Sequence, residues 1–289
     1  MDNLGNALVK KAVVSKVLVT GAQGYLGAKI VSQLRHHGAH PILTGRRAAK
    51  NIHVCDLLNK SNVHKLFNLV TPDLVIHCAA YVPERFEDYN DDETARKNLT
   101  MIKNLLSVSS CPFIYISSMT VYGSGGRFPK HESEAGDPST AYGRSKWEGE
   151  QLFKDAKIPA IAIRIPGLFG PPRMKGLVAN LIKALKKGEA YKLPDNPILW
   201  AAMHVDDAAL SIVHLAFVEM DGFIPVNVGY RDSYSITQLV ELAADIYDCK
   251  IRYDVRHPNF LFNLARCESF GALPERDLRS ALIEMGEKL

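Results

Sequence analysis

The chain has 289 residues, 47% of them hydrophobic and 23% charged, which is ordinary for a soluble globular protein with a sizeable core. Its formal net charge is +4 with the basic residues scattered, so neither the charge nor its pattern suggests a nucleic-acid partner. Five cysteines without CxxC spacing argue against a disulfide frame or zinc site, and no apolar run is long enough to span a membrane.

Two further expectations follow from what the sequence lacks. None of the ten histidines shows metal-ligand spacing, so we expect no metal. The first fifteen residues are too short and too mixed for the apolar core of a signal peptide, so we expect a cytoplasmic protein that does not engage a membrane.

Short apolar runs alternate with helical patterns through the first two-thirds of the chain. The predicted strands lie at residues 16–20, 41–44, 52–55, 74–78, 113–117 and 160–165. Each run is continuously apolar, as in strands that are buried on both faces of a parallel sheet. With helices between most of them, the pattern predicts an α/β fold with a doubly wound parallel sheet, the Rossmann arrangement.

The pattern changes after the sixth predicted strand, where residues 166–173 are rich in Pro and Gly and are predicted as a loop. Further helices are predicted at 176–187, 206–220, 235–248 and 274–286, and strands at 225–229 and 251–255. We interpret residues 1–170 as a dinucleotide-binding domain whose sheet is completed by about 203–230. Residues 171–202 and 231–289 are predicted to form a smaller mixed C-terminal substrate-binding lobe.

Three glycines, Gly21, Gly24 and Gly27, follow the first strand and open the first helix. One glycine permits a tight turn, another lets the backbone approach a pyrophosphate, and the last lets helix and strand pack closely. The phosphate then binds at the helix N-terminus. In this strand-to-helix context the glycines predict a dinucleotide site, with GxxGxxG rather than GxGxxG spacing.

The end of the second predicted strand indicates which dinucleotide is preferred. Folds that prefer NAD usually hold Asp or Glu there, whereas this chain has Arg46 and Arg47 and no carboxylate. A guanidinium binds a 2′-phosphate through charge-assisted hydrogen bonds, and a carboxylate would repel it. The alternative is a pair of solvated arginines in a loop. We favour NADP(H) over NAD(H).

A candidate catalytic group begins where the fifth strand ends, in "YISSMTVYG", because side chains there face the ligand crevice of a parallel sheet. The following helix opens with Tyr142 and Lys146 on one face. A pair of this spacing is a common surface feature of helices. Next to the strand-end serines, however, it indicates a phenol whose pKa is lowered by a nearby ammonium and which transfers a proton near neutral pH.

The segments "TGAQGYLG", "IHCAA", "YISSMTVYG", "YGRSK", "RIPGLFGP" and "HVDD" occur in the order typical of one family. The chain resembles the extended short-chain dehydrogenases/reductases, in particular the NAD-dependent epimerase/dehydratase family of nucleotide-sugar enzymes. The resemblance implies that Tyr142 is the catalytic acid/base, that Lys146 also binds the nicotinamide ribose, and that Ser118 polarises the substrate carbonyl. Thr120 is a candidate helper, and Asn98 matches an asparagine near the site or is a helix-surface amide.

The resemblance also implies which residues bind the cofactor and the substrate, and most of them lie at strand ends and in turns. The cofactor-binding set is Gly21, Gln23, Gly24, Tyr25, Leu26, Gly27, Arg46, Arg47, Asp56, Leu57, Ala79, Ala80, Tyr142, Lys146 and Pro166. The substrate-binding set is Ser118, Thr120, Tyr142 and Arg173. Close packing is the alternative role of the two alanines. Family members are often dimers, so a homodimer is an expectation by analogy.

The chain departs from the family pattern at two places. Nucleotide-sugar members usually carry an arginine shortly before "HVDD", where Leu199 and Trp200 stand here, and Gly167 replaces a common asparagine. Arg173 or Arg231 could substitute for the missing arginine from another loop. His204 and Asp206 match the family, and we interpret them as the start of a helix with an acidic first turn.

Three functions remain open on the sequence. The first is an NADPH-dependent reductase of a keto group on a nucleotide-linked deoxy sugar, which we favour because the two arginines suit exchangeable NADPH. The second is a nucleotide-sugar epimerase with a tightly bound cofactor, or a reductase of another ketone or aldehyde. The third is a cofactor-sensing regulator without catalysis, which the presence of Ser118, Tyr142 and Lys146 disfavours.

Overall fold

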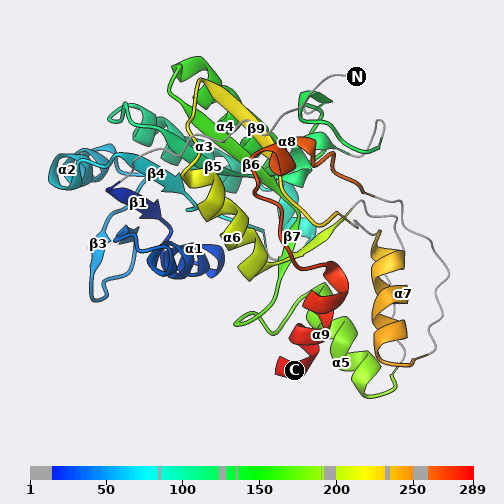
Figure 1. Cartoon of the computed structure of the whole chain (residues 1–289). Helices are drawn as coiled ribbons and strands as arrows, with labels where there is room; N and C mark the ends of the chain where they lie inside the picture. The colour runs from blue at the N-terminus through cyan, green and yellow to red at the C-terminus, as the bar shows by residue number, and fades with distance from the viewer. Residues whose placement is uncertain are drawn as a thin grey trace.

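A seven-stranded parallel sheet forms the centre of the computed structural model, which describes residues 15–83, 86–123, 128–134, 136–189, 191, 200–231, 235–249 and 260–289. The strand order is β3-β2-β1-β4-β5-β6-β9 (Figure 1). The strands are β1 (Val17–Thr20), β2 (Ile42–Gly45), β3 (Ile52–Val54), β4 (Leu74–His77), β5 (Phe113–Ser118), β6 (Ala160–Ile165) and β9 (Phe223–Asn227). The doubly wound fold is confirmed, and its strand order reverses between β1 and β4, where such sheets bind ligands.

Helices cover both faces of the sheet, as the apolar strands require. Val17 and Val19 of β1 belong to a core shared with α1 (Tyr25–His36) and α6 (Val205–Ala216). Leu18, pointing the other way, belongs to a second core. The helices on that face are α2 (Lys60–Val70), α3 (Asp92–Leu106) and α4 (Ala141–Ala156) (Figure 1).

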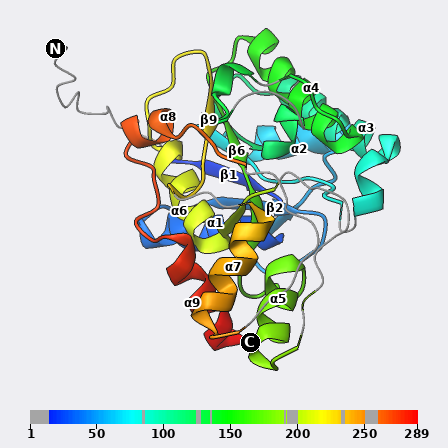
Figure 2. The same cartoon turned by 90° about the vertical axis from the view of Figure 1, so that its right-hand side faces the viewer.

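A smaller lobe lies beyond the carboxyl ends of the strands. Its helices α5 (Leu177–Lys186), α7 (Ile236–Ile246) and α9 (Leu278–Lys288) pack against one another (Figure 2). The short helix α8 (Ala265–Ser269) lies against β9. None of the helices in the described part of the chain combines the length and the apolar character needed to cross a bilayer.

Some predicted elements differ from the structure. The predicted loop at 166–173 contains strand β7 (Gly167–Phe169), which pairs in parallel with β8 (Ala202–His204) in a separate two-stranded sheet. The last helix starts at Leu278 rather than near 274, because Asp277 caps it by accepting the N–H of Ser280 at 2.8 Å. The predicted strand at 251–255 lies outside the described residues.

Candidate active site

Of the three glycines in the turn after β1, two are required by the packing of the backbone and the third is exposed. Gly21 has φ +67°, and a Cβ there would lie 2.8 Å from the backbone of Ala79. A Cβ at Gly27 would overlap the carbonyl of Gly21. The fold itself therefore requires these two glycines. Gly24 is exposed at the N-terminus of α1, and a Cβ there would meet only the Gly21 carbonyl oxygen, at 3.1 Å.

The other turn residues divide between core and surface. Leu26 is buried in the core under α1, so only its backbone can face a ligand. Tyr25 is partly exposed, donates from its hydroxyl to the Gly170 carbonyl at 2.7 Å, and has the Arg173 guanidinium 4.1 Å above its ring. Burial raises the pKa of Tyr25, so its hydroxyl is a neutral donor. Arg173 thus reaches from the lobe to the start of α1.

Both predicted phosphate-binding arginines are exposed at the end of β2. Arg46 donates to the Tyr81 hydroxyl at 2.7 Å and has its guanidinium 4.9 Å from the centre of that ring. The N–H of Arg47 donates to Gln23 Oε1 at 3.3 Å, which joins this loop to the glycine turn. The two arginines and Gln23 therefore lie at one edge of the dinucleotide crevice.

The residues predicted after β3 lie partly in the core. Asp56 is exposed, and its Oδ1 accepts the N–H of Leu58 at 3.0 Å. Leu57 is buried in the core, and its carbonyl accepts from the Asn104 side chain at 2.8 Å. Of this pair, only Asp56 presents its side chain to solvent at the sheet edge.

A chain of hydrogen bonds holds the segment after β4. The N–H of Ala79 donates to Thr20 Oγ1 at 3.2 Å, and that hydroxyl lies 2.8 Å from His77 Nδ1. Ala80 is partly exposed beside it. The Asn98 amide is buried and forms two bonds with the Tyr81 backbone, donating to its oxygen at 3.0 Å and accepting from its nitrogen at 2.8 Å. Asn98 therefore shapes this loop and is not a helix-surface amide.

Ser118, Thr120, Tyr142 and Lys146 come together at the end of β5. Thr140 caps α4 by accepting the N–H of Gly143 at 3.1 Å. A Cβ at Gly143 would lie 2.7 Å from the Thr120 carbonyl oxygen, so the first turn of α4 packs directly on the segment after Ser118. Lys146 is buried, and its ammonium donates to the Ile116 carbonyl of β5 at 2.8 Å.

The hydroxyl of Ser118 is oriented by Thr120. The backbone N–H of Thr120 donates to Ser118 Oγ at 3.2 Å and its hydroxyl does so at 2.9 Å. Because Oγ accepts both bonds, the Ser118 proton is free to be donated to a ligand oxygen in the crevice.

Burial dominates the titration of the tyrosine and lysine. It raises the pKa of Tyr142 well above the ordinary value, with the neighbouring Tyr89 and Cys78 as smaller causes. It lowers the pKa of Lys146 to about 8. The ammonium lies 5.7 Å from the centre of the Tyr142 ring while bonded to the Ile116 carbonyl. The predicted lowering of the Tyr142 pKa is therefore wrong for this arrangement, because burial of the phenol raises its pKa.

Two site residues were missed from the sequence. Tyr89, in the 3-10 helix Phe86–Asn90, packs edge-on against Tyr142 with ring centres 5.6 Å apart. No strand end or motif marks it. Cys78, in the "HCAA" segment, is close enough to Lys146 for the two groups to influence each other's pKa. Its position directly after a strand was a signal that could have found it.

A buried ion pair fixes α4 one turn beyond Lys146. Arg164 of β6 donates to both carboxylate oxygens of Glu150, at 3.0 and 2.6 Å, and both side chains are almost fully buried. Ser117 donates to the same carboxylate at 2.5 Å. A bidentate pair in a dry interior permits only one alignment of the helix against the sheet.

The remaining predicted residues lie after β6 or in the lobe. Pro166 is buried. Arg231 is exposed and forms a surface ion pair with Glu268 at 2.6 Å. Trp200 is partly buried, and Leu199 lies outside the described residues. Of the two candidate substitutes for the missing arginine, Arg173 is therefore the one that reaches the start of α1.

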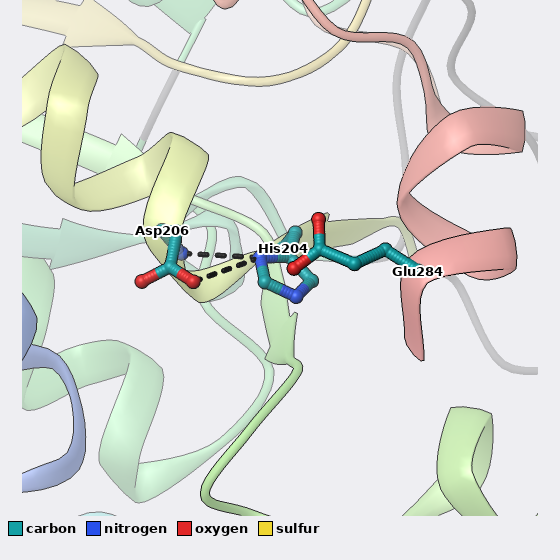
Figure 3. Close-up of side chains that lie close together, drawn as sticks. All are labelled: His204, Asp206 and Glu284. Atoms are coloured by element: carbon teal, nitrogen blue, oxygen red, sulfur yellow. Dashed lines mark hydrogen bonds and ion pairs between the residues drawn. The ribbon is translucent and has the colours of Figure 1, made fainter. Parts of the chain in front are cut away.

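His204, Asp206 and Glu284 form the one group in the described part of the chain that resembles a metal-ligand set, with ligand atoms within 4.8 Å of one another (Figure 3). His204 Nδ1 accepts the N–H of Asp206 at 3.3 Å and so caps α6, which begins here with the expected acidic first turn. The carboxylates already pair with cations: Asp206 with Lys29 at 2.8 Å, and Glu284 with Arg276. We interpret the group as a charge cluster between α1, α6 and α9 and assign no metal to it.

The fold and the strand-end site define a Rossmann-type dinucleotide-binding protein with a Ser–Tyr–Lys group. The model of the NAD dependent epimerase/dehydratase family matches residues 17–229, so the chain belongs to that family.

Similar proteins come from several organisms. Methionine adenosyltransferase 2 subunit beta of Bos taurus is 30% identical over 54% of this chain and 47% of its own length. The chain thus spans about half the length of the first curated relatives it matches. UDP-glucose 4-epimerase of Pasteurella multocida is 25% identical over 91% of both chains. The UDP-glucose 4-epimerase structure from Thermotoga maritima is 21% identical, with a TM-score of 0.79 over 94% of this chain and 97% of its own, which supports the fold.

Proposed function

We propose that this protein is an NAD(P)-dependent enzyme that epimerises the sugar of a nucleotide sugar. The observation that carries the proposal is the packing of the Tyr142 and Lys146 turns of α4 against the Ser118 strand end. Among the curated and structural relatives that match more than nine-tenths of the chain are proteins named UDP-glucose 4-epimerase, which supports an epimerase. They are also the reason for placing epimerisation ahead of the reduction expected from the sequence.

Each residue has a defined part in this reaction. A dinucleotide held at the glycine turn would supply the redox chemistry, which is removal of a hydride from the sugar carbon followed by its return. In its ionised form Tyr142 would take the proton of the sugar hydroxyl, and it would return that proton once the resulting carbonyl is reduced from its other face. Ser118 donates its free proton to the same oxygen, and Thr120 keeps that serine in position. Lys146 holds a positive charge beside the phenol and stabilises its ionised form when the proton moves.

The turn after β1 and the end of β2 are the proposed cofactor site. The open backbone at Gly24 and the helix N-terminus fit a pyrophosphate, because they offer N–H donors and no side chain. Tyr25 and Arg173 close this region from the lobe side, and the guanidinium suits a diphosphate of either cofactor or substrate. Arg46 and Arg47 fit a 2′-phosphate, so NADP(H) is proposed over NAD(H).

The second candidate is an NADPH-dependent reductase of a keto group on a nucleotide-linked deoxy sugar. Two observations favour it. The arginines at β2 suit a cofactor that exchanges, and the raised pKa of Tyr142 keeps the phenol protonated at neutral pH, as a proton donor must be. A regulatory role without catalysis is the third candidate, since one relative is named as a subunit of another enzyme.

One experiment separates these functions. The purified protein is incubated with UDP-galactose and a catalytic amount of NAD⁺ or NADP⁺, and the sugar nucleotides are separated by chromatography. An epimerase forms UDP-glucose without net consumption of cofactor. A reductase leaves UDP-galactose unchanged and consumes NADPH stoichiometrically with a 4-keto-6-deoxy nucleotide sugar. Binding of the cofactor with neither reaction would support the regulatory role.

A further inference from the structure

Two partly exposed residues beyond β6, Gly167 and Trp200, fit each other closely. A Cβ added at Gly167 would overlap the indole of Trp200 at Nε1, Cε2 and Cζ2. The N–H of Gly167 donates to the Ala201 carbonyl at 3.0 Å, which keeps the chain next to Trp200 alongside β7. The indole therefore rests on the bare backbone of Gly167, and any side chain at that position would displace it.

This pair lies close to the proposed reacting group. Ile165, two residues before Gly167, pairs in register with Ser118 across the β5–β6 ladder. With a strand spacing of about 4.8 Å and about 3.3 Å per residue, Gly167 is within roughly 10 Å of Ser118. Trp200 also packs against the cluster that contains Met119 and Val121, the residues on either side of Thr120 along the chain. A sugar held at Ser118 would thus lie within reach of the indole.

The chemistry of the pair suits a sugar ring better than a phosphate. An indole offers a broad apolar face with one N–H donor, and glycine offers no side chain, so neither residue supplies a charge. The C–H face of a pyranose is apolar and packs against such a surface, whereas a diphosphate requires cations or several N–H donors. We propose that Trp200 is a specificity-determining residue that stacks against the sugar ring of the substrate, and that Gly167 makes room for it. This inference rests on the proposed nucleotide-sugar function.

The test uses the fact that the chain has two tryptophans, Trp147 and Trp200. In Trp147→Phe, Trp200 is the sole indole, and its emission is followed while UDP-glucose or UDP is added to the cofactor-saturated protein. Calorimetry measures both affinities independently. UDP-glucose should change the emission of Trp200 and UDP should not, because only UDP-glucose carries the glucose ring.

Variants at both positions complete the test. Trp200→Ala should weaken UDP-glucose binding at least tenfold and leave UDP binding within about threefold, whereas Trp200→Phe should bind both ligands nearly as the parent does. Gly167→Ala should weaken the binding of UDP-glucose to a similar extent, because the added methyl group displaces the indole. Circular dichroism and Tm establish that each variant is folded.

The outcomes separate this inference from the proposed function. Unchanged UDP-glucose affinity in folded Trp200→Ala would overturn the stacking role while leaving the nucleotide-sugar function intact. Equal loss of UDP and UDP-glucose affinity would also overturn it, since the contact would then not be with the sugar. Failure of the parent protein to bind either ligand would reject the proposed function and this inference together.

Discussion

Lys146 is expected to make the protein less stable at neutral pH than a methionine would in the same place. Its side chain is 4% exposed, and burial lowers its pKa from 10.5 to about 8. A folded-state pKa below the unfolded value means that the charged form is penalised in the folded state. This lowered pKa corresponds to a destabilisation of about 3 kcal/mol at pH 7. Loss of the hydrogen bond to the Ile116 carbonyl costs the variant about 1–2 kcal/mol of this difference. The free energy of unfolding of Lys146→Met should therefore exceed that of the wild type by roughly 1–2 kcal/mol at pH 7.

The pH dependence gives the sharper measurement. Between pH 8 and 10.5 the unfolded chain binds a proton at Lys146 that the folded protein has released, so wild-type stability rises with pH relative to the variant. Between pH 7 and pH 9.5 the free energy of unfolding of the wild type should rise by about 2 kcal/mol relative to that of Lys146→Met. Urea unfolding of both proteins at pH 7, 8.5 and 9.5, without added cofactor, measures this difference.

A matched control is available on the same helix. Lys154 is exposed in the last turn of α4, so Lys154→Met should show no such change with pH. A constant difference in unfolding free energy between wild type and Lys146→Met from pH 7 to 9.5 would refute the reasoning, because it would mean that Lys146 titrates normally in the folded protein.

Three further predictions concern function. Tyr142→Phe should lower turnover on a verified substrate by about 10²–10⁴ while cofactor affinity stays the same; near-normal steady-state turnover would assign the proton transfer elsewhere. Gly24→Val should abolish dinucleotide binding in a calorimeter with little change in Tm, because that position is exposed and a Cβ there would meet only one backbone oxygen; normal binding would show that the turn is not the phosphate site. Replacing both Arg46 and Arg47 with Ala should weaken the binding of NADPH at least tenfold more than the binding of NADH. Tighter binding of NADH than of NADPH by the wild type would contradict the assignment.

The strands and the site-bearing helix could be predicted because their signals are local. Continuous apolar runs marked β1 to β6, and the glycines, the serines of β5 and the Tyr142–Lys146 spacing marked the crevice. Strand β7 was missed because its three residues are held by pairing with β8, more than thirty residues away, and not by their own propensity. Three-residue pairings of that kind leave no periodic pattern to read.

Electrostatics and distant contacts could not be predicted in the same way. The spacing of Tyr142 and Lys146 indicated their proximity, but the sign of the pKa shift depends on how much water the fold removes around them. Likewise, the contacts of Arg173 with Tyr25 and of Gly167 with Trp200 join segments that are far apart in the sequence, so no single stretch of sequence contains them.

The forked contact between Arg164 and Glu150 has a consequence for how this protein can move. A slide of α4 by one helical turn would be about 5.4 Å, and it would leave a guanidinium and a carboxylate uncompensated in a dry interior. Tyr142 and Lys146 therefore travel with the sheet as one rigid block, whatever the lobe does on meeting a ligand. Any closing motion must bring the substrate to the phenol, since the phenol cannot come to the substrate.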